Sequence, residues 1–269
     1  MSDLTATPAD RRLSTGLSKV PDPTATFWTI KILATTVGET FADFLATNLN
    51  LGLTNTTIVM GALLAIVLVF QFRSRRYVPG IYWLAVVLIS IVGTLITDNL
   101  TDNFGVPLET TTMVFALALA VVFAAWFASE RTLSIHSITT RRREGFYWLA
   151  ILFTFALGTA AGDLIAEGLN LGYFASALLF AAAIALVGCA YRFAKLNAVL
   201  AFWVAYILTR PLGASLGDFL SQPVADGGLG LGTVATSAIF LSAILGLIIS
   251  LTIRQRKELA SWQPELSNS

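Results

Sequence analysis

A tryptophan, followed ten residues later by a glycine and five residues after that by an aspartate, recurs four times along this chain. The four sets are Trp28/Gly38/Asp43, Trp83/Gly93/Asp98, Trp148/Gly158/Asp163 and Trp203/Gly213/Asp218. The 269 residues include only six tryptophans, so chance does not account for the shared spacing. We therefore expect a repeat protein, in which four copies of one unit build a common core.

The composition is that of an integral membrane protein. Hydrophobic residues make up 56% of the chain and charged residues 12%, whereas soluble domains average about 25% charged residues. Runs of about 20 apolar residues, the length of a transmembrane helix, lie at 27–48, 54–72, 81–102, 109–128, 146–168, 172–191, 197–221 and 232–253. The expected fold is all-α, with eight transmembrane helices as four tandem two-helix repeats. The membrane domain covers 27–253, with repeats at about 27–72, 81–128, 146–191 and 197–253, between a disordered tail over 1–26 and a second tail over 254–269.

Basic residues predict the orientation. Clusters of Lys and Arg follow the second helix of each repeat, for example at Arg73, Arg75 and Arg76, and the loops after the first helices contain none. By the positive-inside rule, both termini are then cytoplasmic. Because successive repeats share one orientation, we expect the first helices, the odd-numbered ones, to lie centrally around a pseudo-twofold or pseudo-fourfold axis along the membrane normal. Residues 49–52 and 169–172 share the sequence Leu-Asn-Leu-Gly, which favours a division into two halves.

The recurring tryptophan, glycine and aspartate, set in pairs of apolar helices, resemble a family of bacterial membrane proteins. This family consists of four tandem repeats of unknown function, each with two transmembrane segments and a tryptophan, and its members are usually described as uncharacterised membrane-anchored proteins. The resemblance covers about residues 27–253. It implies eight helices in a bacterial inner membrane, and it implies no chemistry.

Each first helix carries a polar stripe at four-residue intervals, which places its members on one helical face. The stripes contain seven acids and two bases at membrane depth: Glu39, Asp43, Asp98, Asp102, Asp163, Glu167 and Asp218, with Lys31 and Arg210. Five negative charges are thus unbalanced, and burying them unpaired is costly. We expect cations or protons to neutralise the acids, with Lys31 and Arg210 as counterions or gating groups.

The available ligand atoms favour a hard cation. Carboxylate and hydroxyl oxygens suit Mg²⁺, Mn²⁺, Ca²⁺, Na⁺ or a proton. The chain has one histidine, His136, and one cysteine, Cys189, so a site rich in His or Cys for a soft metal is excluded within one chain. The expected metal ligands are the four repeat aspartates, Asp43, Asp98, Asp163 and Asp218, around a divalent cation such as Mn²⁺ or Mg²⁺.

The other repeated residues are expected to place the helices. Small residues let helices approach closely, so contacts between first helices are predicted at Gly38, Gly93, Gly158 and Gly213. Anchors at the inner membrane interface are predicted at Trp28, Trp83, Trp148 and Trp203. At 1.5 Å per helical residue the aspartates lie about 22 Å from the tryptophans, which predicts an acidic vestibule that opens outward.

The leading hypothesis is a secondary transporter or exchanger of a small hard cation, with Mn²⁺ or Mg²⁺ preferred and Na⁺ or a proton as alternatives. A cation channel is the neighbouring alternative, because rings of acids also form cation filters. The uneven placement of Lys31, Arg210 and Pro211 favours a carrier. A membrane scaffold, whose acids form a structural ion-pair network, is the second alternative, and Asp102 and Glu167 could equally be ordinary interfacial carboxylates.

No enzyme activity is expected, since no nucleophile or metal triad is placed for one. The expected partners are the lipid bilayer and the small cation, without nucleic acid. The oligomeric state, including a homodimer, is left open.

Overall fold

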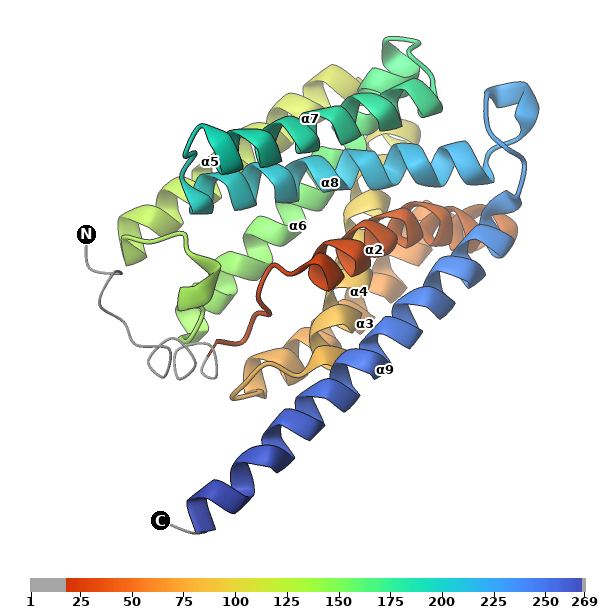
Figure 1. Cartoon of the computed structure of the whole chain (residues 1–269). Coiled ribbons are helices and arrows are strands. Elements are labelled where there is room, and N and C mark those ends of the chain that lie inside the picture. The colour runs from red at the N-terminus through yellow and green to blue at the C-terminus, as the bar shows by residue number, and fades with distance from the viewer. Residues whose placement is uncertain (1–17, 268–269) are drawn as a thin grey trace.

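The computed structural model describes residues 18–267, and its regular elements are all helical (Figure 1). The eight α-helices are α2 (Ala25–Asp43), α3 (Leu53–Arg73), α4 (Pro79–Asp98), α5 (Leu108–Glu130), α6 (Arg141–Asp163), α7 (Tyr173–Phe193), α8 (Ala198–Ser221) and α9 (Gly232–Ser267). Seven of them, α3 to α9, are long and apolar enough to cross a membrane. The remaining helix, α2, contains Lys31, Glu39 and Asp43 and packs among the others. The predicted eight-helix membrane fold is confirmed.

The four helices that begin near a repeat tryptophan form a closed inner ring. In this ring α2 contacts α4, α4 contacts α6, α6 contacts α8, and α8 contacts α2. The other four helices lie outside: α3 packs on α4, α5 on α6, α7 on α8, and α9 on α2. Each outer helix therefore covers the inner helix of the next repeat, and the last repeat covers the first. This cyclic arrangement confirms the expected central helices and their common axis.

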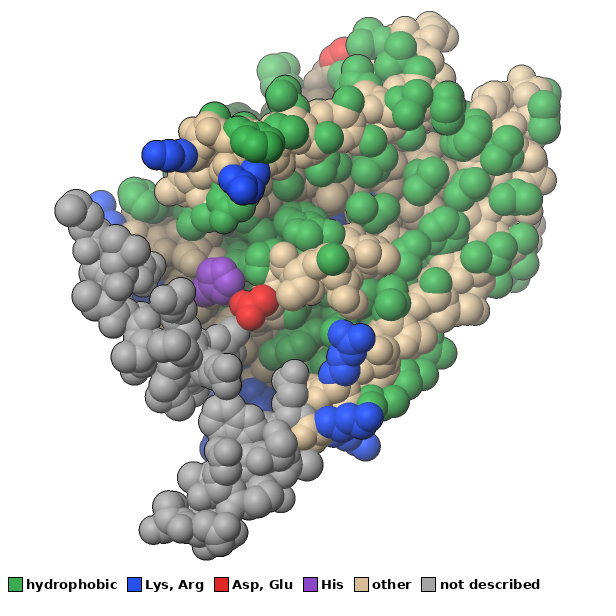
Figure 2. All heavy atoms as spheres, in the orientation of Figure 1, with side chains coloured by type: hydrophobic (Ala, Val, Ile, Leu, Met, Phe, Trp, Pro, Cys, Tyr) green, Lys and Arg blue, Asp and Glu red, His purple; other side chains and the backbone are tan. Residues whose placement is uncertain are grey.

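The surface agrees with a position in a bilayer. Large apolar side chains on the outer helices are more than half exposed, for example Leu117 on α5 and Leu186 on α7. Figure 2 shows hydrophobic side chains over much of one face, with most of the visible Lys and Arg toward one end of the helices. An apolar exposed shell of this kind is stable against lipid, whereas soluble proteins rarely expose large apolar patches.

The repeat glycines set the spacing of the inner ring. The side chain three residues before the glycine of one repeat lies against the glycine of the preceding repeat. The four pairs are Ser90 with Gly38, Phe155 with Gly93, Arg210 with Gly158, and Thr35 with Gly213. A Cβ atom added to any of these glycines would overlap that side chain. The absence of a side chain at the glycine therefore creates the space that the neighbouring helix fills.

Three of the inner helices change geometry directly after their aspartate. A π-helical turn follows α2, α4 and α6, at Phe44–Asn48, Asn99–Asn103 and Leu164–Gly168. In repeats 1 and 3 the Leu-Asn-Leu-Gly segment comes next, and Asn50 and Asn170 have positive φ angles of 56° and 54°. Asparagine tolerates this left-handed conformation better than most residues. This shared backbone conformation supports the relation between the two halves of the chain. The fourth inner helix differs from the other three, because α8 ends at Ser221 without a π-helical turn.

Both ends of the chain differ from the expected tails. Residues 1–17 lie outside the described residues, but Ser18, Lys19 and Val20 are buried, so the predicted disorder does not extend to residue 26. Lys19 donates its backbone N–H to the carbonyl of Ile138 at 3.1 Å, which ties this segment to the α5–α6 connection. At the other end, α9 continues beyond the apolar run to Ser267.

Candidate cation site

Each inner helix contributes one residue, at four-residue intervals, to a series of layers along the axis of the ring. The first, which we call the aromatic layer, consists of Phe27, Tyr82, Tyr147 and Phe202. The next three, towards the aspartates, are Lys31/Val86/Ile151/Tyr206, Thr35/Ser90/Phe155/Arg210 and Glu39/Thr94/Thr159/Ala214. Every residue in these four layers is at most 8% exposed. The four aspartates form the fifth layer, so the interior is closed at the tryptophan end and becomes acidic towards the other.

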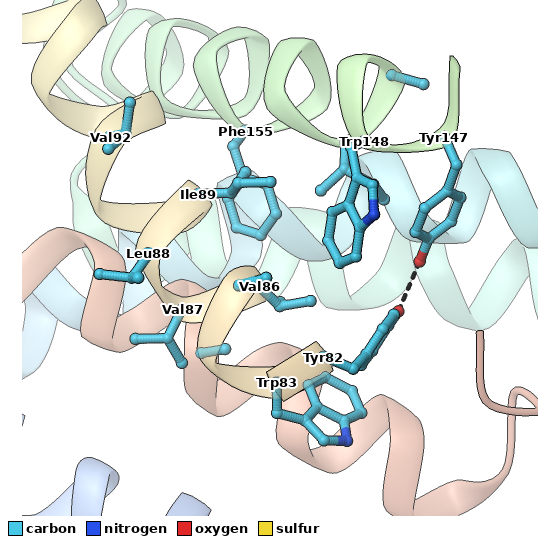
Figure 3. Close-up of a cluster of buried hydrophobic side chains, with 14 of the residues drawn as sticks. Tyr82, Trp83, Val86, Val87, Leu88, Ile89, Val92, Tyr147, Trp148 and Phe155 are labelled. Carbon is cyan, nitrogen blue, oxygen red and sulfur yellow. Dashed lines mark hydrogen bonds between the residues drawn. The ribbon is translucent and has the colours of Figure 1, made fainter. Parts of the chain in front are cut away.

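The aromatic layer is tightly connected. Tyr82 and Tyr147 share a hydrogen bond of 2.5 Å between their hydroxyl oxygens, drawn as the dashed line in Figure 3. The ring centroids of Phe27 and Phe202 are 6.1 Å apart, which is within the range of favourable aromatic contacts. The sequence analysis did not identify this layer. Its signal is the aromatic residue that directly precedes each of the four repeat tryptophans.

Arg210 occupies the axis of the ring and contacts all three other inner helices. Its Nη2 donates to Glu39 Oε2 of α2 at 2.9 Å, to Thr159 Oγ1 of α6 at 2.6 Å, and to Thr94 Oγ1 of α4. Its Nη1 donates to the carbonyl oxygen of Thr35 at 3.3 Å. The sequence predicts Lys31 and Arg210 as counterions or gating groups, and the acid that pairs with Arg210 could have been one of the four repeat aspartates. Glu39 takes that place, because it stands one helical turn closer to Arg210 than Asp43 does.

Three carboxylates converge next to this ion pair. Oxygens of Glu39, Asp163 and Asp218 all lie within 4.8 Å of one another. Adjacent oxygen ligands of an octahedral Mg²⁺ ion are about 2.9 Å apart and opposite ones about 4.2 Å, so the three carboxylates would move closer together to bind one ion. Only two of the four repeat aspartates belong to this group. Asp43 and Asp98 lie outside it but within electrostatic range of Glu39.

The exposure of the acids increases towards the aspartate end. Glu39 and Asp218 are buried, Asp43, Asp98 and Asp163 are half-buried, and Asp102 and Glu167 are exposed. Glu167 accepts a hydrogen bond from the Tyr173 hydroxyl at 2.8 Å, and Asp102 accepts one from Thr101 at 2.9 Å. The exposure of the carboxylates therefore rises from Glu39, the most deeply placed acid, to the aspartate end of the ring.

Lys31 is the second base at membrane depth, and its surroundings differ from those of Arg210. Its side chain is fully buried, and among the described residues its Nζ has no hydrogen-bond partner. The Nζ lies 4.0 Å from the ring centroid of Phe155 and 4.2 Å from that of Tyr206. A desolvated cation–π contact contributes about 2 kcal/mol, whereas burying an ion costs several kcal/mol even after relaxation. Two aromatic faces therefore compensate a buried ammonium group only in part.

The tryptophans lie mostly inside the protein, although anchors facing the headgroups were expected. Trp83, Trp148 and Trp203 are at most 4% exposed, and Trp28 is half-buried. Trp203 Nε1 donates to the carbonyl of Leu133 at 2.9 Å, and Trp83 Nε1 donates to the Tyr77 hydroxyl at 3.1 Å.

Burial raises the pKa of Tyr77, which lies between α3 and α4, and the hydrogen bond from Trp83 opposes that shift. The Tyr77 hydroxyl is therefore neutral at physiological pH and serves as an acceptor for the indole. The tryptophans thus hold the tryptophan end of the bundle together.

Comparisons with known proteins agree with the repeat structure. The model of the Repeat of Unknown Function (DUF347) matches the chain four times, at residues 26–77, 81–132, 146–197 and 201–257. Each match contains one inner and one outer helix. Neither a curated protein nor a solved structure matches the chain. The four matches together cover most of the sequence, and the chain therefore belongs to the DUF347 family of tandem membrane repeats, whose function is unknown.

Proposed function

We propose that this protein is a secondary transporter or exchanger of a small hard cation, with Mn²⁺ or Mg²⁺ preferred. The observation that carries the proposal is the buried group of Glu39, Asp163 and Asp218, whose oxygens lie within 4.8 Å of one another. Oxygen ligands from carboxylates, with threonine hydroxyls nearby, suit hard divalent cations. Three helices of the ring supply these ligands, so movement of the helices would change the site.

The local charge balance favours a divalent ion. Glu39, Asp163 and Asp218 bring three negative charges, and Arg210 is the one base bonded to the group among residues 18–267. Two negative charges are left, which one divalent cation would neutralise. A single Na⁺ or proton would leave one buried charge uncompensated, and uncompensated charge in a membrane interior is costly.

Arg210 gives the site a built-in competitor. Its guanidinium bonds Glu39 Oε2 at 2.9 Å, the carboxylate that an arriving cation would also use. A bound cation would compete with Arg210 for Glu39 while Arg210 remains beside the carboxylates as their counterion, and departure of the cation would restore the full ion pair. Such an exchange of partners keeps Glu39 paired in both states, which avoids the cost of about 3–5 kcal/mol for an unpaired buried charge.

The closed layers favour a carrier over a channel. Four successive layers between the aspartates and the tryptophan end consist of residues at most 8% exposed, and Arg210 fills the axis. Conduction through a channel needs a continuous hydrated path. Access from one end, with the other end closed, is instead the geometry of alternating access. The non-transport scaffold is the second candidate and predicts a different response to metal.

A thermal-shift experiment separates the two readings. Saturating Mn²⁺, at about 100 times its dissociation constant, should raise the melting temperature of the wild-type protein by about 5–10 °C, because it binds only the folded state. Asp163→Asn removes a ligand charge but keeps the size of the side chain, and it should abolish the shift. Asp98→Asn is the matched control, since Asp98 occupies the same repeat position outside the carboxylate group, and it should retain most of the shift.

The scaffold hypothesis predicts that Asp163→Asn melts at a lower temperature than the wild type. It also predicts that metal changes the melting temperature of neither protein. Absence of a shift with Mn²⁺, Mg²⁺, Ca²⁺ or Na⁺ would contradict the proposed function. Uptake of Mn²⁺ into reconstituted vesicles then tests transport directly.

A further inference from the structure

Lys31 stands at a separate point on the axis, between the aromatic layer and Arg210. It belongs to the second layer, and the carboxylate group begins two layers further on. Figure 3 shows Tyr147 and Phe155 projecting from α6 towards side chains of α4, with Phe155 the closer of the two to the aspartate end. Phe155 is also one of the two rings that face the Lys31 Nζ. Lys31 is therefore sealed from the tryptophan end by the aromatic layer and from the acids by Arg210.

In the part of the chain that the structure describes, no acceptor lies within hydrogen-bond distance of the Lys31 ammonium. From α8 come Arg210, which is itself a cation, and Tyr206, whose ring face is turned to the Nζ. Tyr82 of α4 and Tyr147 of α6 hydrogen-bond to each other. On α2 itself the nearest acid is Glu39, which is bonded to Arg210, and residues 232–253 of α9 contain no titratable group. An ammonium group has three donors to satisfy, whereas a neutral amine in this place leaves no charge unpaired.

We propose that Lys31 carries the proton that is exchanged for the transported cation, an inference that rests on the proposed function. When the aromatic layer opens, water reaches Lys31 and the amine takes up a proton. When the layer closes and the ring opens from the aspartate end instead, the amine releases that proton to water at the aspartate end. A protonated Lys31 adds a second positive charge beside Arg210, which disfavours a cation at Glu39. Proton and cation then oppose each other's binding, and such negative coupling between two ligands is what exchange requires.

The test uses the full chain reconstituted into vesicles, with Mn²⁺ as the probe. Counterflow of labelled against unlabelled Mn²⁺ needs no proton, whereas uptake driven by a pH gradient does. Lys31→Met keeps the length and the packing between the two rings but cannot bind a proton. We expect this variant to retain counterflow within about twofold and to lose pH-driven uptake, with the accompanying internal pH change, by about tenfold or more. Ala205→Met, on the outer side of α8, is a control for an added methionine and should keep both activities.

Each outcome separates this inference from the proposed function. Wild-type protein without counterflow or uptake would refute transport itself. Normal pH-driven uptake by Lys31→Met would overturn the role of Lys31 and leave transport intact. If the variant loses both activities but its melting temperature still rises with Mn²⁺, Lys31 serves the conformational cycle rather than the proton, and the proposal is equally overturned. Loss of that rise as well would make Lys31 part of cation binding, which also contradicts it.

Discussion

Two buried bases of this protein have carboxylate partners, one on the axis and one near the tryptophan end. Arg210 pairs with Glu39. Lys19 pairs with Glu144 at 2.6 Å, and Gln71 donates to the other oxygen of Glu144 at 3.0 Å. The second pair joins the N-terminal segment to α3 and α6 and lies outside the candidate site. The contribution of the Lys19–Glu144 pair to stability can therefore be tested with variants that leave the cation site unchanged.

Replacing Glu144 by Leu should lower the free energy of unfolding by about 3–5 kcal/mol, the cost of leaving the partner charge buried and unpaired. Lys19→Met should have a comparable effect for the same reason. The double variant should lose much less than the sum of the two, because no buried charge remains. Unfolding curves of the four purified proteins in detergent measure these values. Additive losses would show that the two residues do not stabilise each other.

At the scale of the helices, the repeat glycine determines how closely neighbouring inner helices approach. The same contact occurs at all four interfaces, although the inserted side chain is Ser90, Phe155, Arg210 or Thr35. The glycine thus keeps the contact between neighbouring helices the same at all four interfaces, while the inserted residue varies in size and charge. This combination lets one repeat supply the axial base and another supply an aromatic ring for Lys31.

Gly38→Ala should destabilise the bundle by about 1–3 kcal/mol, the usual cost of overpacking, because the new Cβ would overlap Ser90. The double variant Gly38→Ala/Ser90→Gly returns the space and should recover part of the loss. Gly61→Ala on α3 is the matched control, since nothing lies within 4 Å of its Cβ position. It should be neutral or stabilising by up to about 1 kcal/mol. Equal melting temperatures for Gly38→Ala and Gly61→Ala would argue against the glycine contacts.

The whole molecule is a ring that closes on itself. Because α9 of the last repeat packs on α2 of the first, the four repeats have no free edge. The loops at the tryptophan end carry the Lys and Arg clusters, and those at the aspartate end carry none. By the positive-inside rule we propose that the tryptophan end is cytoplasmic and that the acidic vestibule opens to the outside of a bacterial inner membrane.

Thiol labelling checks this orientation. In a Cys189→Ser background, Asp226→Cys places a thiol at the aspartate end and Arg75→Cys places one at the tryptophan end. A membrane-impermeant maleimide added to intact spheroplasts should label the first and spare the second, and both should react after permeabilisation. Labelling of Arg75→Cys in intact spheroplasts would reverse the assigned orientation.

The sequence by itself determined the membrane class, the eight helices, the fourfold repeat and the set of acids at membrane depth. These features depend on apolar length and on spacing within one helix, which are read directly along the chain. The predicted ends of the first three inner helices, at residues 48, 102 and 168, lie within one residue of the ends of the π-helical turns, whereas the change to π-helical geometry after Asp43, Asp98 and Asp163 was not predicted.

Only the tertiary structure decided which acids meet. Glu39 joins Asp163 and Asp218, although the repeat pattern favours four equivalent aspartates. The order of the helices in the ring and the rotation of each about its own axis bring residues of different repeats together. Contacts between glycines and side chains more than 50 residues away along the chain fix that order and rotation. Spacing within one helix carries no information about such contacts, so the sequence identified the candidate ligands and the packing of the ring selected among them.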